Sequence, residues 1–411
     1  MEFVRHTLGN GLEIVAECNA AAHSAAYGFF VRTGARDETD PESGVSHFLE
    51  HMMFKGTPRR SADDVNREFD EMGAYYNAFT SEENTVYYAA VLPEFQGRVV
   101  ELLADILRPA LRDEDFTTEK QVILEEIQMY DDQPPFGADE KCRAAYFGAH
   151  PLGRSVLGTI KSITDLSVDQ MRGYFDRRYR PSNIVLAAAG KVDFPSLLMS
   201  AEDACGPWEP SDAPRPVEPP APRRSFHVLE KSTAAQQYLL RLSPGPSAEQ
   251  GDRFAAKLLA TILGDESGSR LYWELVDPGL AESVVVSHYE HQGAGVMLTY
   301  MSCEPDRTQD NLQRILKVFR DVQRDGVTQA ELDQARSKIR SRIVLSSERP
   351  RGRMFVVGSD WIYRGKYRPV GEDLADVNAV TVEAIAEVLR NYPLDVATTV
   401  SIGPLGHLEQ V

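Results

Sequence analysis

Residues 44–57 combine residue types and spacing that are typical of a metal site. They read GVSHFLEHMMFKGT, and the pattern predicts a helix that Gly56 closes at its C-terminal end. At about 100° per residue, His47, Glu50 and His51 fall on one face of this helix. Two imidazoles four residues apart lie one turn from each other and can share one ion, and zinc accepts such nitrogen ligands readily.

Glu50 lies beside both histidines on the predicted helix and can take a proton from a water that the metal activates. The order H-x-x-E-H is the inverse of the H-E-x-x-H zinc motif. The apolar side chains fall on the opposite face, where they can pack into a core: Val45, Phe48, Leu49, Met52 and Met53. We therefore expect the polar face to look into a cleft, with Glu50 as the general base.

A catalytic zinc normally has three protein ligands, so the third must come from another segment. Residues 119–127 follow Thr117 and Thr118, where the sequence predicts the start of a helix. Glu119 and Glu126 lie on one face of that helix, since two turns separate them. We expect Glu126 to bind the metal and Glu119 to accept an N–H from a ligating imidazole.

Each feature of this set also has a purely structural interpretation. Histidine pairs on helices are more often surface or core pairs than metal ligands, and the five-residue motif also occurs by chance. The amphipathic helix and the paired downstream acids favour a site for one zinc ion per chain. A structural zinc site is disfavoured because no fourth ligand such as cysteine or histidine is evident.

Residues 47–57 resemble the zinc helix of the pitrilysin and insulinase family of metallopeptidases, in its mitochondrial-processing-peptidase-like branch. In that family the third metal ligand is a glutamate about 75 residues after the second histidine. In this chain Glu126 lies 75 residues after His51. Residues 73–88 resemble the family's substrate-binding edge strand, and residues 150–153 and 179–183 match it further. The resemblance is dense in the N-terminal half and weak in the C-terminal half.

The resemblance implies a zinc-dependent endopeptidase that hydrolyses short or unfolded peptides inside a clamshell chamber. The chamber would be closed by two subunits, as a homodimer or as a heterodimer with a homologous subunit. Four residues are expected to bind an extended peptide by adding it to a sheet edge: Asn77, Ala78, Phe79 and Thr80. An ordinary turn or strand-end role remains the alternative for Asn77.

Residues 275–283 depart from the family's pattern. Active relatives usually carry an arginine and a tyrosine there that reach the scissile region of the substrate, whereas this chain has Val276 and Glu282 and is one residue shorter. Arg270 and Tyr272 are nearby candidates to substitute, with simple packing as the alternative. The departure motivates a second hypothesis, a metal-bearing but slow peptide-binding subunit that acts with an active partner. The complete set of metal ligands and general base argues against it, because a pure binder needs no base.

The elements that must position these residues follow a repeated pattern. Asn10 and Gly11 separate two strand-like runs, which predicts a hairpin. Residues 167–190 and 381–403 each predict a helix followed by a strand that ends in glycine. We predict an α+β fold of two homologous domains, each a mostly antiparallel sheet packed against helices. The domains are residues 1–206, which bind zinc, and 225–411, which lack the metal motif, with a proline-rich linker at 207–224.

Composition narrows the partners and the compartment. The net charge of −18 argues against a nucleic-acid partner, which would need clustered Lys and Arg. The acidity indicates either solubility or an acidic cavity that concentrates basic peptides. The four cysteines form no C-x-x-C pair, and no apolar run approaches the roughly 18 residues of a membrane span. The first residues lack a basic segment followed by an apolar one. We therefore expect a cytoplasmic protein without membrane contact.

Overall fold

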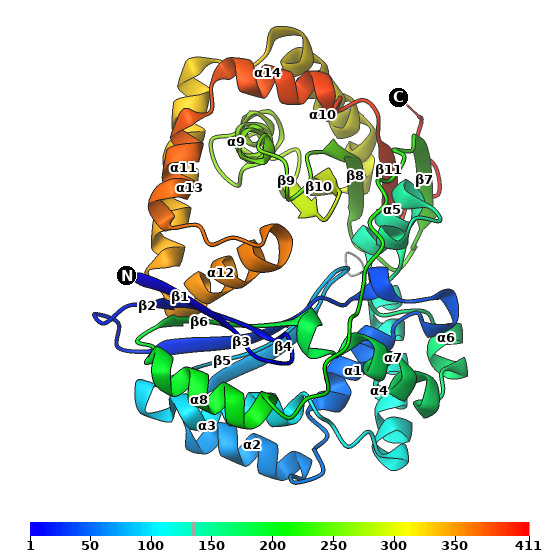
Figure 1. Ribbon diagram of the computed structural model, residues 1–411. Helices are drawn as coiled ribbons and strands as arrows, with labels where there is room; N and C mark the ends of the chain where they lie inside the picture. The colour runs from blue at the N-terminus through cyan, green and yellow to red at the C-terminus, as the bar shows by residue number, and fades with distance from the viewer. Residues whose placement is uncertain (134–136, 411) are drawn as a thin grey trace. The chain divides into compact units, whose positions relative to one another are not determined.

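The computed structural model describes residues 1–133 and 137–410, which form two compact units (Figure 1). Unit 1 contains Met1–Gln128, Arg154–Pro216 and Val344–Pro369, and unit 2 contains Met129–Gly153, Val217–Ile343 and Val370–Val411. Each unit therefore takes one segment from the other half of the sequence. Among the described residues, no helix is both long enough and apolar enough to cross a membrane.

Unit 1 is built on a six-stranded sheet in the order β1-β2-β6-β3-β5-β4. Only the β2–β6 pair is parallel. The predicted hairpin is confirmed, since β1 and β2 pair from Thr7 and Glu13 outward, and Gly11 adopts φ +93° in the connection. The strands are β1 Glu2–Thr7, β2 Glu13–Cys18, β3 Ala25–Val31, β4 Tyr75–Thr80, β5 Thr85–Val91 and β6 Ile184–Gly190.

One face of this sheet is covered by α12 (Pro350–Arg364), a helix from the C-terminal half of the sequence. Met354, Val357 and Trp361 pack on the buried side chains of β2, β3, β5 and β6. The contact is close because Gly358 lies over the ring of Phe30, where a Cβ would come within 2.4 Å of the ring carbon Cζ. The other helices of this unit are α1 Val45–Met53, α2 Ala62–Glu71, α3 Gln96–Ile106, α4 Asp113–Asp132, α6 Ile160–Asp165, α7 Val168–Arg178 and α8 Phe194–Cys205.

Unit 2 has a five-stranded sheet in the order β7-β11-β8-β10-β9. Its β7–β11 pair is parallel and the remaining pairs are antiparallel, which repeats the arrangement β2-β6-β3-β5-β4 of unit 1. This correspondence is what the predicted internal repeat requires. The strands are β7 Ser225–Glu230, β8 Gln237–Gly245, β9 Ser283–His291, β10 Ala294–Cys303 and β11 Thr398–Gly403.

Here too a helix from the other half covers one face of the sheet, because α5 (Ala138–Phe147) packs on β8 and β11. The opposite face carries the larger core, to which α9, α10 and α14 contribute. The remaining helices are α9 Arg253–Gly264, the π-helical η6 Tyr272–Val276, α10 Thr308–Asp325, α11 Gln329–Ser347, α13 Val370–Ala379 and α14 Val382–Asn391. Both sheets are mixed but mostly antiparallel, so the predicted α+β class is confirmed.

The predicted metal-site helix is α1, and its buried face is the predicted one, with Val45, Phe48, Leu49, Met52 and Met53 all in the core. The predicted closure at Gly56 is wrong, because α1 ends at Met53. Gly56 instead adopts φ +108° in a turn where a Cβ would lie 2.6 Å from the carbonyl oxygen of Arg60. The glycine is needed for this close approach of two backbone segments and not as a helix cap.

The helix that carries Glu119 and Glu126 is α4, which begins at Asp113 and not at Thr117 as predicted. Three acidic residues in its first turn favour this earlier start, because they interact well with the partial positive charge of a helix N-terminus: Asp113, Glu114 and Asp115. The predicted common face is confirmed, since Glu119 is buried and Glu126 half-buried, whereas Glu125 is exposed.

Candidate metal centre

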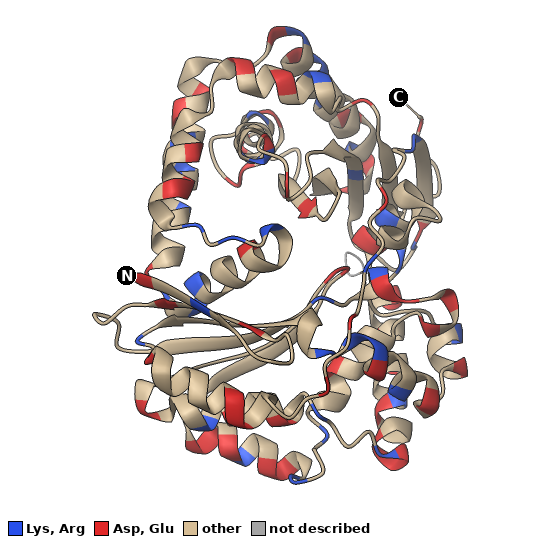
Figure 2. Cartoon of the chain, in the orientation of Figure 1, with Lys and Arg blue, Asp and Glu red and all other residues tan. Residues whose placement is uncertain are grey.

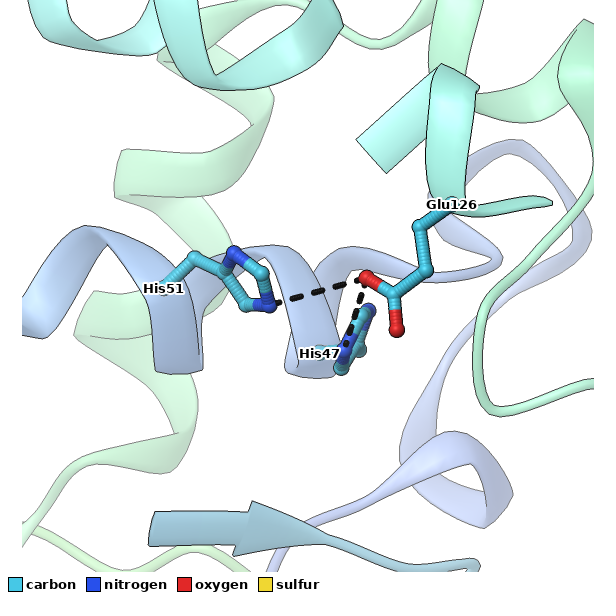
Figure 3. A group of neighbouring side chains, drawn as sticks. All are labelled: His47, His51 and Glu126. Carbon is cyan, nitrogen blue, oxygen red and sulfur yellow. Dashed lines mark ion pairs between the residues drawn. The ribbon is translucent and has the colours of Figure 1, made fainter. Parts of the chain in front are cut away.

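Three side chains from two helices converge in unit 1. Nε2 of His47 and Nε2 of His51, both on α1, each lie 3.8 Å from Oε2 of Glu126 on α4 (Figure 3). One ligand atom from each residue lies within 4.8 Å of the other two. Among the described residues, no other group of three His, Cys, Asp or Glu side chains meets this condition. The structure thus brings together the three residues that the sequence singled out as metal ligands.

The size and chemistry of this group fit a zinc ion. With bonds of roughly 2.0–2.2 Å, neighbouring ligand atoms of a tetrahedral zinc lie about 3.4 Å apart. The 3.8 Å separations exceed this by a few tenths of an ångström, which small side-chain rotations remove. Two imidazoles and one carboxylate also form the ligand set of a catalytic site, which leaves a fourth position for water or substrate.

Glu119 orients His51 from behind. Its Oε1 lies 2.8 Å from Nδ1 of His51, and because an ionised carboxylate only accepts, Nδ1 donates; in the neutral imidazole, Nε2 then carries the lone pair that a metal needs. Nζ of Lys55 lies 2.5 Å from Oε2 of the same carboxylate. Burial raises the pKa of Glu119, but His51 and Lys55 outweigh it and hold this pKa below its ordinary value. Glu119 is therefore an ionised acceptor.

The two histidines have opposite electrostatic environments. Burial, and secondarily the charge of His51, lowers the pKa of His47 to about 3, so His47 is neutral and able to bind a metal. For His51, burial lowers the pKa, but the carboxylates of Glu119, Glu126 and Glu50 outweigh it and raise the pKa above its ordinary value. The concentration of negative charge round His51 is the field that a divalent cation would neutralise.

Glu50 is held by a contact that the sequence did not predict. Oγ1 of Thr80, the last residue of β4, donates to Oε2 of Glu50 at 2.6 Å. Burial raises the pKa of Glu50 in spite of this bond, which suits a group that must gain and release a proton. The sequence predicted that Thr80 contacts substrate. It did not predict the contact with Glu50, because nothing in the sequence indicates that the end of β4 lies beside α1. Lys55 was also missed, although its spacing of four residues from His51 was a signal.

The four expected peptide-binding residues lie on β4, which pairs only with β5 among the described strands and so forms a sheet edge. Tyr75 and Phe79 are exposed on it, and the side chain of Asn77 accepts from the amide of Ala78 at 2.8 Å. Because Thr80 reaches Glu50, this edge lies beside the candidate metal ligands.

The residues singled out in the second half have partners inside unit 2. Arg270 donates to both carboxylate oxygens of Glu331, at 2.7 and 3.0 Å, and to the carbonyl oxygen of Gly326 at 2.9 Å. Tyr272 begins the π-helix η6, and its ring lies edge-on to that of Trp273. Val276 packs on the core and Glu282 accepts from Gln236. Each of these side chains therefore has a contact within unit 2, and the ion pair of Arg270 is compatible with a structural role.

Comparison with known proteins agrees with this geometry. Residues 13–160 match the model of the insulinase family of peptidases, family M16. Residues 165–339 match the model described as the M16 peptidase inactive domain. An uncharacterized zinc protease of Mycobacterium tuberculosis is 37% identical over 399 residues, covering 94% of this chain and 90% of the relative. The chain belongs to the insulinase family, M16. An uncharacterized zinc protease of Bacillus subtilis is 31% identical over 409 residues, covering 98% of this M16 chain and 99% of the relative.

Solved structures show that the fold of this M16 chain is a recurrent one. A protease from Helicobacter pylori matches with a TM-score of 0.92 at 21% identity, covering 98% of this chain and 99% of that one. A putative M16-like peptidase from Alicyclobacillus acidocaldarius matches with a TM-score of 0.86 at 24% identity, covering 98% of both. At such identities the likeness concerns the fold alone. The two-domain α+β architecture is therefore that of M16 peptidases.

Proposed function

We propose that this M16 chain is a zinc-dependent endopeptidase that hydrolyses peptide bonds in short or unfolded peptides. One observation supports this most: Nε2 of both histidines faces a single oxygen of Glu126, while Glu50 lies one residue before His51 on the same helix face. A structural metal site would have no use for an additional carboxylate of raised pKa at this point. The names of the relatives as zinc proteases point the same way.

In this proposal His47, His51 and Glu126 hold one zinc ion, and Glu119 fixes the ring of His51. When bound, zinc would polarise the scissile carbonyl and lower the pKa of water toward about 7. Glu50 takes the proton of the attacking water and later returns it to the leaving amine. The bond from Thr80 holds Oε2 of Glu50, which leaves Oε1 to exchange the proton.

The substrate would lie along β4 as an added strand, with its main chain bonded to residues 77–80. Such binding is blind to most side chains, which suits a peptidase with mixed peptide substrates. The net charge of −18 favours basic peptides among them, because an acidic protein raises the local concentration of cations. The exposed rings of Tyr75 and Phe79 offer apolar contacts to alternate side chains of the peptide.

A second candidate function rests on Val276 and Glu282. Neither side chain can donate a hydrogen bond to the negative charge that develops on the scissile carbonyl, as an arginine or a tyrosine could. Val276 packs on the core of unit 2, and Glu282 accepts a hydrogen bond from Gln236. The candidate is a slow, metal-bearing subunit that binds peptides and acts with an active partner. In the first proposal two copies of this chain form a homodimer, and in the second the chain forms a heterodimer with a homologous subunit. A cytoplasmic location belongs to both.

The experiment that separates these proposals is incubation of the purified chain, alone, with a mixed peptide library. The first proposal predicts cleavage that a chelator abolishes and added zinc restores. Cleavage only after a homologous partner is added would support the second. Cleavage that persists in the metal-free chain would contradict both.

A further inference from the structure

A cavity of about 260 Å³ opens in unit 2 beside the parallel strand pair β7–β11, between the sheet and α10. Phe226 of β7, Thr399 of β11 and Arg241 of β8 line its floor, and Phe319 and Arg320 of α10 line its wall. Every lining residue belongs to unit 2, whereas the candidate metal ligands belong to unit 1. The cavity therefore shares no residue with the candidate metal ligands.

Arg241 is a buried cation in this cavity, with only 9% of its surface exposed. Its terminal nitrogens donate to Oγ1 of Thr399 at 3.0 Å and to the carbonyl oxygen of Leu394 at 2.8 Å, both neutral acceptors. Its Nε has no hydrogen-bond partner in the described part of the chain, and the nearby Asp395, whose negative charge acts on Arg241, forms its ion pair with Arg224 instead. A buried cation whose hydrogen bonds go only to neutral acceptors is costly, so an anion would stabilise this arrangement.

The fold itself does not require an arginine at this position. Gly190 and Gly403 end the equivalent strands β6 and β11, and four residues earlier Leu186 pairs with Phe29 while Thr399 pairs with Arg241. Phe29 is fully buried against Trp208 in unit 1. The repeat thus fills the same sheet position with an apolar ring in one unit and with a buried guanidinium in the other, which indicates a role for the charge beyond packing.

The remaining charges of the cavity also favour an anion. Arg224 and the exposed Arg320 lie on its lining, and the single lining acid, Asp395, is 3.2 Å from Arg224. Three arginines against one aspartate leave an excess of two positive charges in a chain whose net charge is −18. Figure 2 shows that basic and acidic residues are otherwise interspersed along the helices. The net charge of the side chains that line the cavity is therefore positive, opposite in sign to the net charge of the chain.

We propose that this cavity binds a phosphoryl group, as inorganic phosphate or as a small phosphate monoester. A guanidinium group can donate two parallel hydrogen bonds to two oxygens of one phosphate. A phosphate dianion would offset both excess positive charges, whereas a single carboxylate would offset only one. The apolar side chains of Phe226, Leu316, Phe319 and Leu394 offer a wall for the organic part of a monoester. The site is independent of the proposed peptidase activity.

Isothermal titration of the whole chain with inorganic phosphate and with phenyl phosphate tests the proposal, with chloride as the salt control. We expect saturable binding by wild type and binding weakened about tenfold or more in Arg320→Glu, since hydrogen bonds to charged groups are the strong ones. Arg320 is exposed, so this variant is expected to fold. The matched control is Arg340→Glu, an exposed position on α11 outside the cavity that makes the same charge change.

The two ligands distinguish the sources of the phosphoryl group. Tighter binding of phenyl phosphate would assign a monoester, and equal binding would assign free phosphate. Arg241→Lys keeps the charge but removes the planar donors, and it is expected to weaken both ligands while circular dichroism reports the fold. Absence of saturable binding, equal loss in the Arg320 and Arg340 variants, or an equal response to chloride would overturn the proposal.

Discussion

Oε1 of Glu119 lies 2.8 Å from Nδ1 of His51, although 68 residues separate them in the sequence. This contact joins α1 to α4, so the helix that carries two candidate ligands is fixed to the helix that carries the third. It also fixes the tautomer of His51, because the carboxylate accepts the proton of Nδ1. The geometry of the candidate metal centre therefore depends on a residue that is itself no ligand.

We expect Glu119→Gln to weaken zinc binding by about 10- to 100-fold, since the partners of ligating histidines typically contribute this much to metal affinity. The measurement is a competition titration of the metal-free chain with zinc and a chromophoric chelator. Glu125→Gln is the matched control, because Glu125 is exposed on the same helix. Equal zinc affinity in the two variants would refute the orienting role.

We expect Thr80→Val to lower kcat about tenfold at unchanged zinc content, because it removes the hydrogen bond of 2.6 Å to Glu50. Thr80→Ser keeps a hydroxyl and should restore most of the rate. Steady-state kinetics on one peptide separate this role from simple substrate contact, which would raise KM instead. A valine variant with the kcat of the serine variant would show that Thr80 does not position the base.

Arg215 lies in the proline-rich segment that the sequence presents as a linker, yet its side chain is nearly buried. It donates to both carboxylate oxygens of Asp37, at 2.9 and 2.5 Å. We expect Arg215→Met to lower the free energy of unfolding by about 2 kcal/mol, because it removes two hydrogen bonds to the buried carboxylate of Asp37, whose charge Arg178 still neutralises. Urea unfolding measures this loss. Glu209→Gln, at an exposed position of the same segment, should change little; a comparable loss there would mean that any change in the segment destabilises the chain.

The ion pair of Arg270 with Glu331 predicts a specific response to acid. Burial raises the pKa of Glu331, but bonds from Arg270 and Thr328 outweigh it and lower this pKa to about 2 in the folded chain. In the unfolded chain the value is about 4.3. The folded state thus gains stability above about pH 4.3, and this gain is lost as the pH falls toward 2.

We therefore expect Glu331→Gln to have a lower thermal midpoint than wild type at pH 7, and the difference to vanish as the pH approaches 2. Thermal unfolding across this pH range is the measurement. Asp333→Asn, at an exposed carboxylate on the same helix, serves as the control. A difference that stays constant with pH would show that the loss comes from packing and not from ionisation of Glu331.

The sequence predicted which side chains of the candidate metal centre share a helix face, because this depends on local helical spacing. His47, Glu50 and His51 share a face by periodicity, and the same rule places Glu119 with Glu126. The closure at Gly56 and the start at Thr117 were wrong because tertiary contacts and first-turn acids set those helix ends. These errors did not move the candidate ligands.

Long-range pairings left no local signal. The bond between Thr80 and Glu50 depends on how β4 lies against α1, and neither segment encodes it alone. The covering of each sheet by a helix from the opposite half of the chain was equally hidden, since α5 and α12 look like ordinary amphipathic helices of their own halves. The proline density at 207–224 correctly indicated a lack of helix and strand, but not that Arg215 is buried there.

Glu50→Gln tests the central claim most directly, because it replaces the proposed base by a group of nearly equal shape that cannot accept a proton. Zinc content and peptide turnover are measured on the same preparation of variant and wild-type chain. We predict one equivalent of zinc in both chains and a loss of turnover of about 100-fold or more in the variant, since general base catalysis contributes roughly that much. Turnover at the wild-type rate in the zinc-loaded variant, with contaminating peptidase excluded, would contradict the account.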